Sequence, residues 1–288
     1  MPFTLKDIPD QTGKLAVITG ATGGLGYETA LALAGANANV VLTGRNEQRG
    51  TDALARIRAA FPRANVSYET LDVASLKSIA DFARRFSAAH KSLDILVNNA
   101  GVMMLPKRMT TEDGFERQFG TNHLGHFALT EQLLPLLRAA PHPRVVTVSS
   151  LAHRWLGRMR FDDLQLQRHY NPSRAYGQSK LANLLFALEL QRRSDQGGWG
   201  LTSLAAHPGT ADTDLIANGP ASGGRRLVAF GGRILIGLFG QDAASGALPQ
   251  IYAATAPDVT PGGYYGPSGF IEMTGPPAPA RINGRARN

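Results

Sequence analysis

The chain has 288 residues, of which 43% are hydrophobic and 18% charged, a composition typical of folded globular proteins that excludes a disordered chain. Cysteine is absent, which excludes disulfides, thiolate metal sites and cysteine nucleophiles. The formal net charge is +8, and part of the excess lies in a short basic C-terminal tail with Arg281, Arg285 and Arg287. No zinc pattern or recognition-helix pattern accompanies these residues, so they predict a solvated basic surface and no nucleic-acid partner.

Two stretches bear on membrane targeting. Residues 1–14 include acidic side chains and lack the apolar core of a secretory signal. The apolar stretch 227–240 is interrupted by Arg233 and by glycines, and it is too short to cross a bilayer as a helix. We therefore expect a soluble, cytoplasmic protein without a transmembrane segment, and the sequence leaves both a monomer and a homo-oligomer open.

Apolar runs bounded by turn residues recur along the chain and predict strands. They cover residues 15–19, 39–43, 66–72, 93–98, 144–150 and 201–206. Helical patterns lie between them, including residues 47–61 and 75–89. This alternation predicts an α/β protein with a doubly wound parallel sheet (Rossmann fold) in three α/β/α layers. No linker or composition shift divides residues 1–288, so we expect a single domain.

The first predicted strand leads into a glycine-rich turn, TGATGGLG at 19–26. Gly20 suits a tight turn, Gly24 lets the backbone approach a pyrophosphate, and Gly26 lets the following helix pack closely on the strand. That helix, which we expect to run to about Gly35, presents free N–H groups to the phosphates. The turn therefore predicts a dinucleotide-binding site.

The end of the second strand indicates which dinucleotide is bound. Sites selective for NAD place an Asp or Glu here to accept hydrogen bonds from the ribose hydroxyls. This chain has Gly44 at that position, followed by Arg45. A guanidinium pairs with a 2′-phosphate through two parallel hydrogen bonds, so Arg45 predicts NADP(H). The alternative is a solvated arginine ahead of a helix.

Five further motifs follow in chain order: NNAG at 98–101, TNHLGHF at 121–127, VSSLAH at 148–153, YGQSK at 176–180 and HPG at 207–209. With the TGxxxGxG spacing of the turn, NNAG and YGQSK resemble the short-chain dehydrogenase/reductase family over nearly the whole chain. VSSLAH and HPG resemble its retinol-dehydrogenase-like branch. The resemblance implies an NADP(H)-dependent alcohol dehydrogenase or carbonyl reductase that transfers hydride.

Two residues of YGQSK are spaced for acid/base chemistry. Tyr176 and Lys180 are four apart on a predicted helix, so they share one face. A cation beside a phenol is expected to lower the phenol pKa. By the resemblance, Tyr176 is the catalytic acid/base and Lys180 also contacts the nicotinamide ribose. The resemblance further implies that Ser150, rather than Ser149, bonds the reacting oxygen, and that the amide of Asn122 holds a water near Lys180.

The cofactor contacts are assigned by the resemblance and by their position after successive strands. The expected cofactor-binding residues are Gly20, Thr22, Gly24, Leu25, Gly26, Arg45, Asp72, Val73, Asn99, Ala100, Gly101, Tyr176, Lys180, Pro208, Gly209 and Thr213. Asn, Gly and Pro are also ordinary turn formers, so their joint placement at one edge of the sheet is what favours the functional interpretation.

Two segments bear on the substrate. Residues 151–175 are long for a simple connection, and residues 211–240 combine glycines with large apolar side chains. Such loops over the carboxyl edge predict a hydrophobic lid and a bulky, largely apolar carbonyl or alcohol substrate. The alternative is a surface for dimerisation or membrane contact. The identity of the substrate, the direction of the reaction and its stereochemistry stay open.

Other functions are weighed against this one. His123 and His126 have no third ligand at a suitable spacing, so we interpret them as packing residues and expect no metal. A catalytically idle dinucleotide sensor is disfavoured by the complete set of Asn122, Ser150, Tyr176 and Lys180. A C=C double-bond reductase is disfavoured because the light-dependent protochlorophyllide reductases, relatives of this branch, use cysteine.

Overall fold

The computed structural model describes residues 2–210, 241–282 and 284. The predicted lid at 211–240 lies outside the described residues, and so do Thr213 and two arginines of the basic tail, Arg285 and Arg287. Within the described part of the chain, no helix is both long enough and apolar enough to cross a membrane.

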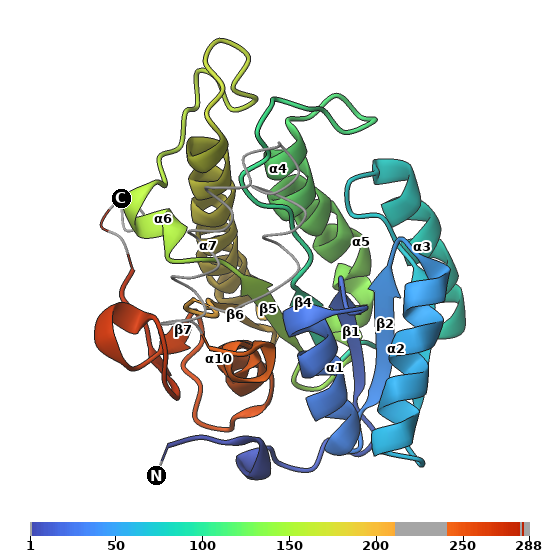
Figure 1. The fold of residues 1–288 in the computed structure, drawn as a ribbon. Coiled ribbons are helices and arrows are strands. Elements are labelled where there is room, and N and C mark those ends of the chain that lie inside the picture. Colours follow the sequence, from blue (N-terminus) through green and yellow to red (C-terminus); the bar gives the residue numbers. More distant parts are fainter. Residues whose placement is uncertain (1, 211–240, 283, 285–288) are drawn as a thin grey trace.

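Among the described residues, eight strands form one sheet in the order β3-β2-β1-β4-β5-β6-β7-β8 (Figure 1). They are β1 (Leu15–Thr19), β2 (Asn39–Gly44), β3 (Val66–Thr70), β4 (Ile95–Asn98), β5 (Arg144–Val148), β6 (Thr202–Ala206), β7 (Tyr264–Pro267) and β8 (Pro277–Pro279). All pairs are parallel except that β8 runs antiparallel to β7. The chain order reverses between β1 and β4, and ligands bind at such a reversal in doubly wound sheets.

The predicted fold class is confirmed, and each of the six predicted strands is present. β3 and β5 end two residues earlier than predicted, where the chain enters the loops that carry the site, whereas β4 begins two residues later and β6 one residue later. The sequence did not predict β7 and β8, since YYGP and PAP contain the residues that usually mark turns.

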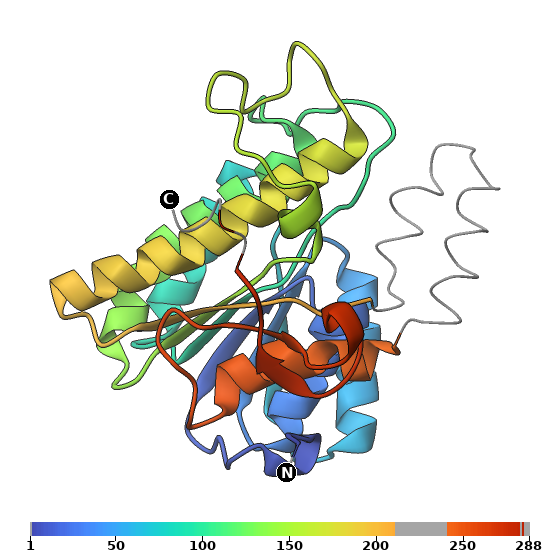
Figure 2. The same ribbon diagram turned by 90° about the vertical axis from the view of Figure 1, so that its left-hand side faces the viewer.

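Helices cover both faces of the sheet. α1 (Gly24–Gly35), α2 (Glu47–Ala60) and α10 (Ala243–Thr255) lie on one face, and α3 (Leu76–Ala89), α5 (Gly125–Ala139) and α7 (Pro172–Gly197) lie on the other. The shorter helices are η1 (Leu5–Asp7), α4 (Arg117–Phe119), the π turn η2 (Gly120–Leu124), α6 (Ala152–Trp155) and η4 (Phe270–Glu272). Figure 2 shows α7 on one side of the sheet and α1 with α10 on the other.

Both faces of the central strands are buried. Along β1, Ala16 and Ile18 pack under α1, whereas Val17 packs under α3 and α5. Successive side chains of a strand point to opposite faces, so a strand covered on both sides is apolar at every position. This explains why the predicted strands read as continuous apolar runs.

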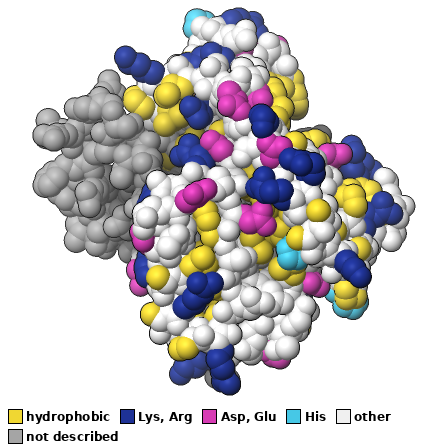
Figure 3. Space-filling model, turned by 90° about the vertical axis from the view of Figure 1, so that its right-hand side faces the viewer, with side chains coloured by type: hydrophobic (Ala, Val, Ile, Leu, Met, Phe, Trp, Pro, Cys, Tyr) yellow, Lys and Arg dark blue, Asp and Glu magenta, His cyan; other side chains and the backbone are white. Residues whose placement is uncertain are grey.

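Charge is interspersed on the face that carries α2 and α3. Figure 3 shows Lys and Arg side chains mixed with Asp and Glu rather than gathered in one stripe. On α3, Asp81 pairs with both Lys77 and Arg84, and Arg85 lies near Glu69. The excess positive charge is thus locally offset on this face.

Gly125, the first residue of α5, packs directly on the loop after β3. A Cβ atom at this position would lie 1.8 Å from the carbonyl oxygen of Val73. The Cα of residue 125 and the carbonyl of Val73 both belong to the main chain, so neither can move away by a change of side-chain rotamer. Gly125 therefore sets how closely α5 approaches the loop with Asp72 and Val73.

We expect Gly125→Ala to destabilise the protein by about 1–3 kcal/mol, because it overpacks a rigid contact. A loss of stability would be informative, because replacing Gly with Ala inside a helix otherwise stabilises the protein by up to about 1 kcal/mol. Urea unfolding followed by circular dichroism measures the change, and a gain in stability would contradict the contact.

Candidate functional site

A cavity of about 500 Å³ lies along the carboxyl ends of the central strands. Its wall contains most of the residues predicted from the sequence: Gly20, Thr22, Gly24, Leu25, Gly26, Arg45, Asp72, Val73, Asn99, Ala100, Gly101, Ser150, Tyr176, Lys180, Pro208 and Gly209. Asn122 is fully buried and does not line the cavity. The sequence motifs, far apart along the chain, therefore meet at one edge of the sheet.

The glycine-rich turn lies against the loop after β4 with no room for a side chain between them. Gly20 has a φ of +66°, and a Cβ there would lie 3.0 Å from the Cα of Ala100. A Cβ on Gly26 would lie 2.5 Å from the carbonyl oxygen of Gly20. The hydroxyl of Thr19 accepts hydrogen bonds from the backbone N–H groups of Asn99 and Ala100, each at 2.9 Å. The floor of the cavity is thus main chain.

The N-terminus of α1 opens onto this floor. Its N-cap residue is Gly23, which has no side chain to cap the helix, and the first turn, Gly24 to Tyr27, contains no acidic residue. The N–H groups at a helix N-terminus carry positive partial charge and attract anions. The cradle therefore fits the pyrophosphate of a dinucleotide.

Two arginines line the cavity beyond the end of β2. Arg45 is largely exposed, and its Nη1 lies 3.9 Å from Oδ2 of Asp72. Arg49, in the first turn of α2, lines the same cavity, and the sequence analysis missed it. Its position in the first turn of the helix that begins just after Arg45 is the signal from which it could have been found. Together the guanidiniums give this end of the cavity positive charge.

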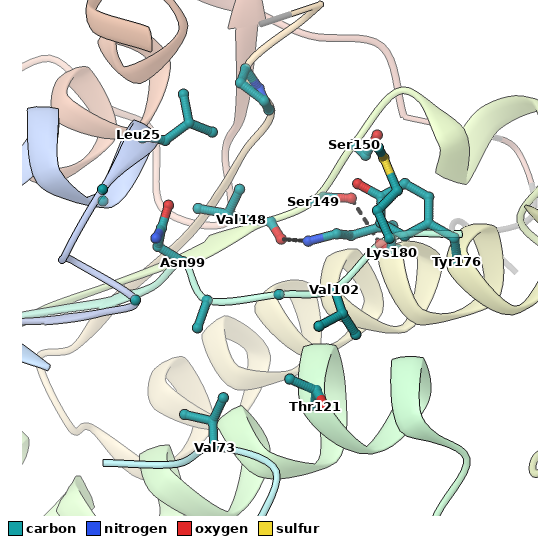
Figure 4. Close-up of a pocket in the computed structure, with 18 of the residues that line it drawn as sticks. Leu25, Val73, Asn99, Val102, Thr121, Val148, Ser149, Ser150, Tyr176 and Lys180 are labelled. Carbon is teal, nitrogen blue, oxygen red and sulfur yellow. Dashed lines mark hydrogen bonds between the residues drawn. The ribbon is translucent and has the colours of Figure 1, made fainter. Parts of the chain in front are cut away.

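The other end of the cavity gathers Ser150, Tyr176 and Lys180, as Figure 4 shows, with Leu25 and Val73 farther away. Nζ of Lys180 donates to the carbonyl oxygen of Val148 at 3.0 Å. The hydroxyl of Ser149 donates to the backbone carbonyl of Lys180 at 2.8 Å. Ser150 instead makes a hydrogen bond with Tyr176. Of the two adjacent serines, Ser150 is therefore the one joined to the phenol.

Burial shifts the pKa values of Tyr176 and Lys180 at this end of the cavity. It raises the pKa of Tyr176 to about 12, although the hydrogen bond with Ser150 acts in the opposite direction. Burial also lowers the pKa of Lys180 to about 8. The expectation that Lys180 lowers the phenol pKa is wrong here, because Nζ lies 5.8 Å from the ring centroid and is bonded to Val148. At neutral pH the phenol keeps its proton and the ammonium keeps its charge.

Asn122 lies in the π turn η2, and its side chain is bonded within the protein. Nδ2 donates to the carbonyl of Val102 and to the hydroxyl of Ser179, each at 2.9 Å. Oδ1 accepts from the backbone N–H of Val102 at 2.8 Å. Both amide hydrogens are used within the protein, and the water expected near Lys180 stays a prediction. The side chain ties the loop after β4 to α7.

His126 is buried, as the packing interpretation expects, and both of its ring nitrogens also have hydrogen-bond partners. Nδ1 lies 3.0 Å from the carbonyl oxygen of Asn122, which can only accept, so Nδ1 carries the hydrogen. Nε2 then accepts from the hydroxyl of Thr19 at 2.8 Å. Burial lowers the pKa of His126 to about 4, which keeps the ring neutral. His126 thus connects the glycine-rich turn to the π turn.

His123 fits the packing interpretation better. Its ring lies near those of Phe119, Phe127 and Phe186, and it makes a polar contact of 3.3 Å with Asn183. Within residues 2–210, 241–282 and 284, no group of three or more His, Asp or Glu side chains is placed to hold a metal ion.

An apolar wall borders the end with Tyr176, and the sequence analysis identified only the part of it that belongs to the segment 151–175. It comprises Val102, Met103, Met104, Leu151, Trp155 and Leu156. These residues come from the loop after β4 and from the segment around α6 after β5. Their signal was apolar composition directly after two motif-bearing strands. A wall of this kind accommodates an apolar ligand.

Comparisons with known proteins agree with this geometry. The sequence model of the short chain dehydrogenases matches residues 14–221. Retinol dehydrogenase 12 of Mus musculus is 44% identical over 249 residues, which are 86% of this chain and 75% of that protein. Polyprenol dehydrogenase of Mus musculus is 44% identical over 256 residues, 88% of this chain and 74% of that protein.

Solved structures show the same fold. An uncharacterized protein from Mycobacterium paratuberculosis aligns with a TM-score of 0.80 and 38% identity, over 100% of this chain and 92% of that one. RhlG of Pseudomonas aeruginosa, solved in a complex with NADP, aligns with a TM-score of 0.66 and 25% identity, over 88% of this chain and 94% of that one.

We expect His126→Phe to destabilise the protein by at least about 2 kcal/mol at pH 7.5. The ring volume is kept, but Thr19 and the carbonyl of Asn122 lose buried hydrogen-bond partners, and each such loss costs about 1–3 kcal/mol. His123→Phe, three residues earlier in the π turn η2, is the matched control and should cost less. Urea unfolding of both variants measures the loss of stability. Equal losses would show that the hydrogen bonds of His126 with Thr19 and Asn122 do not add to stability.

The pH dependence of unfolding gives a second readout for His126. Its folded pKa of about 4 lies below the reference of 6.5, so between these values the unfolded chain binds a proton that the folded chain excludes. The stabilisation by neutral His126 is therefore complete above pH 6.5 and falls toward pH 4 by about 1.4 kcal/mol per pH unit. His126→Phe should reduce this slope, and an unchanged slope would contradict the buried neutral ring.

Proposed function

The chain belongs to the short-chain dehydrogenase family, in its retinol-dehydrogenase-like branch, and from that premise we propose that it is an NADP(H)-dependent alcohol dehydrogenase or carbonyl reductase. The family prediction made from the motifs is thereby confirmed. The observation that carries the proposal is the joint placement of Ser150, Tyr176 and Lys180 at one end of a cavity whose other end has Arg45 and Arg49. The proposed substrate is a bulky, largely apolar alcohol, aldehyde or ketone.

The cofactor half of the proposal rests on the main-chain cradle. The pyrophosphate would bind at the uncapped N-terminus of α1, where the glycines leave space for it. Arg45, with Arg49 beside it, would bind the 2′-phosphate through charge-assisted hydrogen bonds. Gly44, at the end of β2, provides no carboxylate to repel that phosphate. The NADP complex of the related RhlG supports this choice of cofactor.

The chemical half rests on the protonated phenol. The nicotinamide supplies or accepts the hydride. In reduction, Tyr176 donates its proton to the carbonyl oxygen, and Ser150 donates a hydrogen bond to the same oxygen. Lys180, still charged at neutral pH, would contact the nicotinamide ribose rather than the phenol. The product is an alcohol, whose new C–H hydrogen would come from the cofactor and whose O–H proton would come from Tyr176.

The substrate class rests on the apolar wall next to Tyr176. Side chains such as Met103, Leu151 and Trp155 offer few hydrogen bonds and a large contact area. Retinol and polyprenol, which appear in the names of two relatives, are apolar alcohols. A cytoplasmic location stays a prediction of the sequence, and the oligomeric state stays open.

A panel of carbonyl compounds with NADPH, combined with Tyr176→Phe, tests the proposed function. Bulky aromatic or long-chain aldehydes and ketones should be reduced more efficiently than small polar ketones. Tyr176→Phe should lower kcat by about 10²–10⁴-fold, because only the transferable proton is lost. NADPH absorbance measures turnover, and fluorescence titration should show nearly unchanged NADPH affinity.

Tyr252→Phe, on α10 and remote from the cavity, is the matched control and should keep wild-type turnover. Normal turnover by Tyr176→Phe would overturn the assigned acid. Activity confined to the C=C bond of enones would assign the other reductase chemistry. Efficient reduction of small polar ketones would contradict the role of the apolar wall.

Arg45→Ala tests the choice of cofactor. Loss of a charge-assisted pair costs about 1.5–3 kcal/mol, so we expect the KM for NADPH to rise by about tenfold or more. The KM for NADH should change little, because NADH has no 2′-phosphate. Arg84→Ala removes a guanidinium from the surface of α3 and is the control. Equal losses with both cofactors, or a wild-type preference for NADH, would show that Arg45 does not bind the phosphate.

A further inference from the structure

We propose that Glu272 is a positioning residue, whose carboxylate holds the loop after β5 and the loop after β6 in register at the chemical end of the cavity. The inference concerns Glu272, which lies outside the motifs, and its kinetic consequence rests on the proposed function. The contact, which we call the Glu272 cluster, consists of Glu272, Arg154 and His207.

The cluster joins three separate parts of the chain through one oxygen atom. Oε2 of Glu272 lies 3.1 Å from Nη1 of Arg154 and 3.3 Å from Nε2 of His207. The Glu272 side chain is 14% exposed and that of His207 is fully buried, so solvent screens these contacts weakly. Oε1 accepts a further hydrogen bond from the backbone N–H of Arg281. The carboxylate is thus held from several directions.

His207 transmits this contact to the loop after β6. Nδ1 accepts from the backbone N–H of Gly209 at 3.2 Å, so in the neutral ring Nε2 carries the hydrogen, and Nε2 lies 3.3 Å from Oε2 of Glu272. Gly209 lines the cavity with Pro208 and Thr210. The turn has little freedom, since Gly209 has a φ of +66° and a Cβ there would lie 2.1 Å from the carbonyl of Met273.

Arg154 transmits the contact to the loop after β5. It lies in α6, directly after His153, whose backbone N–H and Nδ1 both donate to the carbonyl of Ser150, at 3.0 and 2.6 Å. The same short segment carries Leu151 and Trp155 of the apolar wall. Fixing Arg154 therefore restrains the backbone that presents the Ser150 hydroxyl.

The backbone under Glu272 is strained, which is unusual for a surface turn. Ile271 and Glu272 have φ values of +47° and +61°, in the left-handed region that disfavours residues with a Cβ. Such strain persists where the surrounding contacts determine the conformation. Here those contacts are the ones that direct the carboxylate to Arg154 and His207.

The carboxylate stays charged at neutral pH. Burial on its own raises the pKa of Glu272, but the hydrogen bond from His207, the N–H of Arg281 and the charge of Arg154 outweigh it and hold the pKa below its usual value. The cluster therefore contains a charged carboxylate between a cation and an N–H donor, and removing its charge weakens both contacts together.

Glu272→Gln is the variant that tests the proposal. It keeps the size of the side chain but removes the charge. We expect kcat for the best carbonyl substrate of the panel to fall by about tenfold to hundredfold, since small misplacements of reacting groups have effects of this size. The NADPH dissociation constant should change less than about threefold, because the phosphate contacts lie at the other end of the cavity. Hydrogen exchange of peptides covering 150–157 and 207–210 should become faster.

Glu189→Gln is the matched control. Glu189 also pairs with two cations, Arg192 and Arg193, but lies on the exposed face of α7. It should leave kcat and the exchange of both loops unchanged. Wild-type kcat or unchanged loop exchange in Glu272→Gln overturns the proposal, and so does an equal effect of the two variants.

Two further variants test the proposal in case the Glu272→Gln protein does not fold. Glu272→Asp should restore part of kcat because it restores the charge, and Arg154→Gln should loosen 150–157 more than 207–210. Equal loosening of both loops by Arg154→Gln overturns the proposal. If the wild type reduces no carbonyl compound, the proposed function fails, while loop exchange still decides the role of Glu272.

Discussion

The main chain at the carboxyl ends of β1 and β4 comes so close that no side chain fits between, and the rest of the site is arranged around that contact. A Cβ on Gly20 or on Gly26 would meet backbone atoms at 3.0 Å or less. The hydroxyl of Thr19 holds the contact together, because it accepts from two backbone N–H groups of the β4 loop and donates to His126. A ligand on this floor is oriented by backbone atoms on rigid strands rather than by mobile side chains.

Exclusion of water has a different consequence at the chemical end. It raises the pKa of Tyr176 and lowers that of Lys180, so both groups move toward their neutral forms. With the pKa of Tyr176 at about 12, the phenol is set to donate a proton, which is the requirement of carbonyl reduction. Oxidation of an alcohol needs the phenol to lose that proton first, and at neutral pH this requires additional positive charge close to its oxygen.

The parts of the site that depend on local sequence were predictable, and the parts that depend on contacts between distant segments were not. The glycine-rich turn is a local pattern, and strand β1 occupies the predicted residues 15–19. By contrast, the pKa of Tyr176 depends on how many groups cover it, and no spacing rule contains that information. The partners of Asn122 and His126 were also hidden, because Val102, Ser179 and Thr19 lie far from them along the chain. Glu272 follows a strand, β7, that the sequence did not predict.

The cofactor floor and the apolar wall differ in which amino-acid substitutions they can accept. On the cofactor floor, a substitution at Gly20 or Gly26 adds a Cβ where backbone atoms already lie, so almost no alternative side chain fits. The apolar wall lies on loops, where Trp155 is 61% exposed and exchange of one apolar side chain for another displaces no backbone. Substrate preference can therefore diverge while cofactor binding is kept. When the side chains of these loops change, the loop backbones must keep their position relative to the cofactor floor. Contacts on the side of the loops that faces away from the substrate can hold that position and leave the side chains of the apolar wall free to vary.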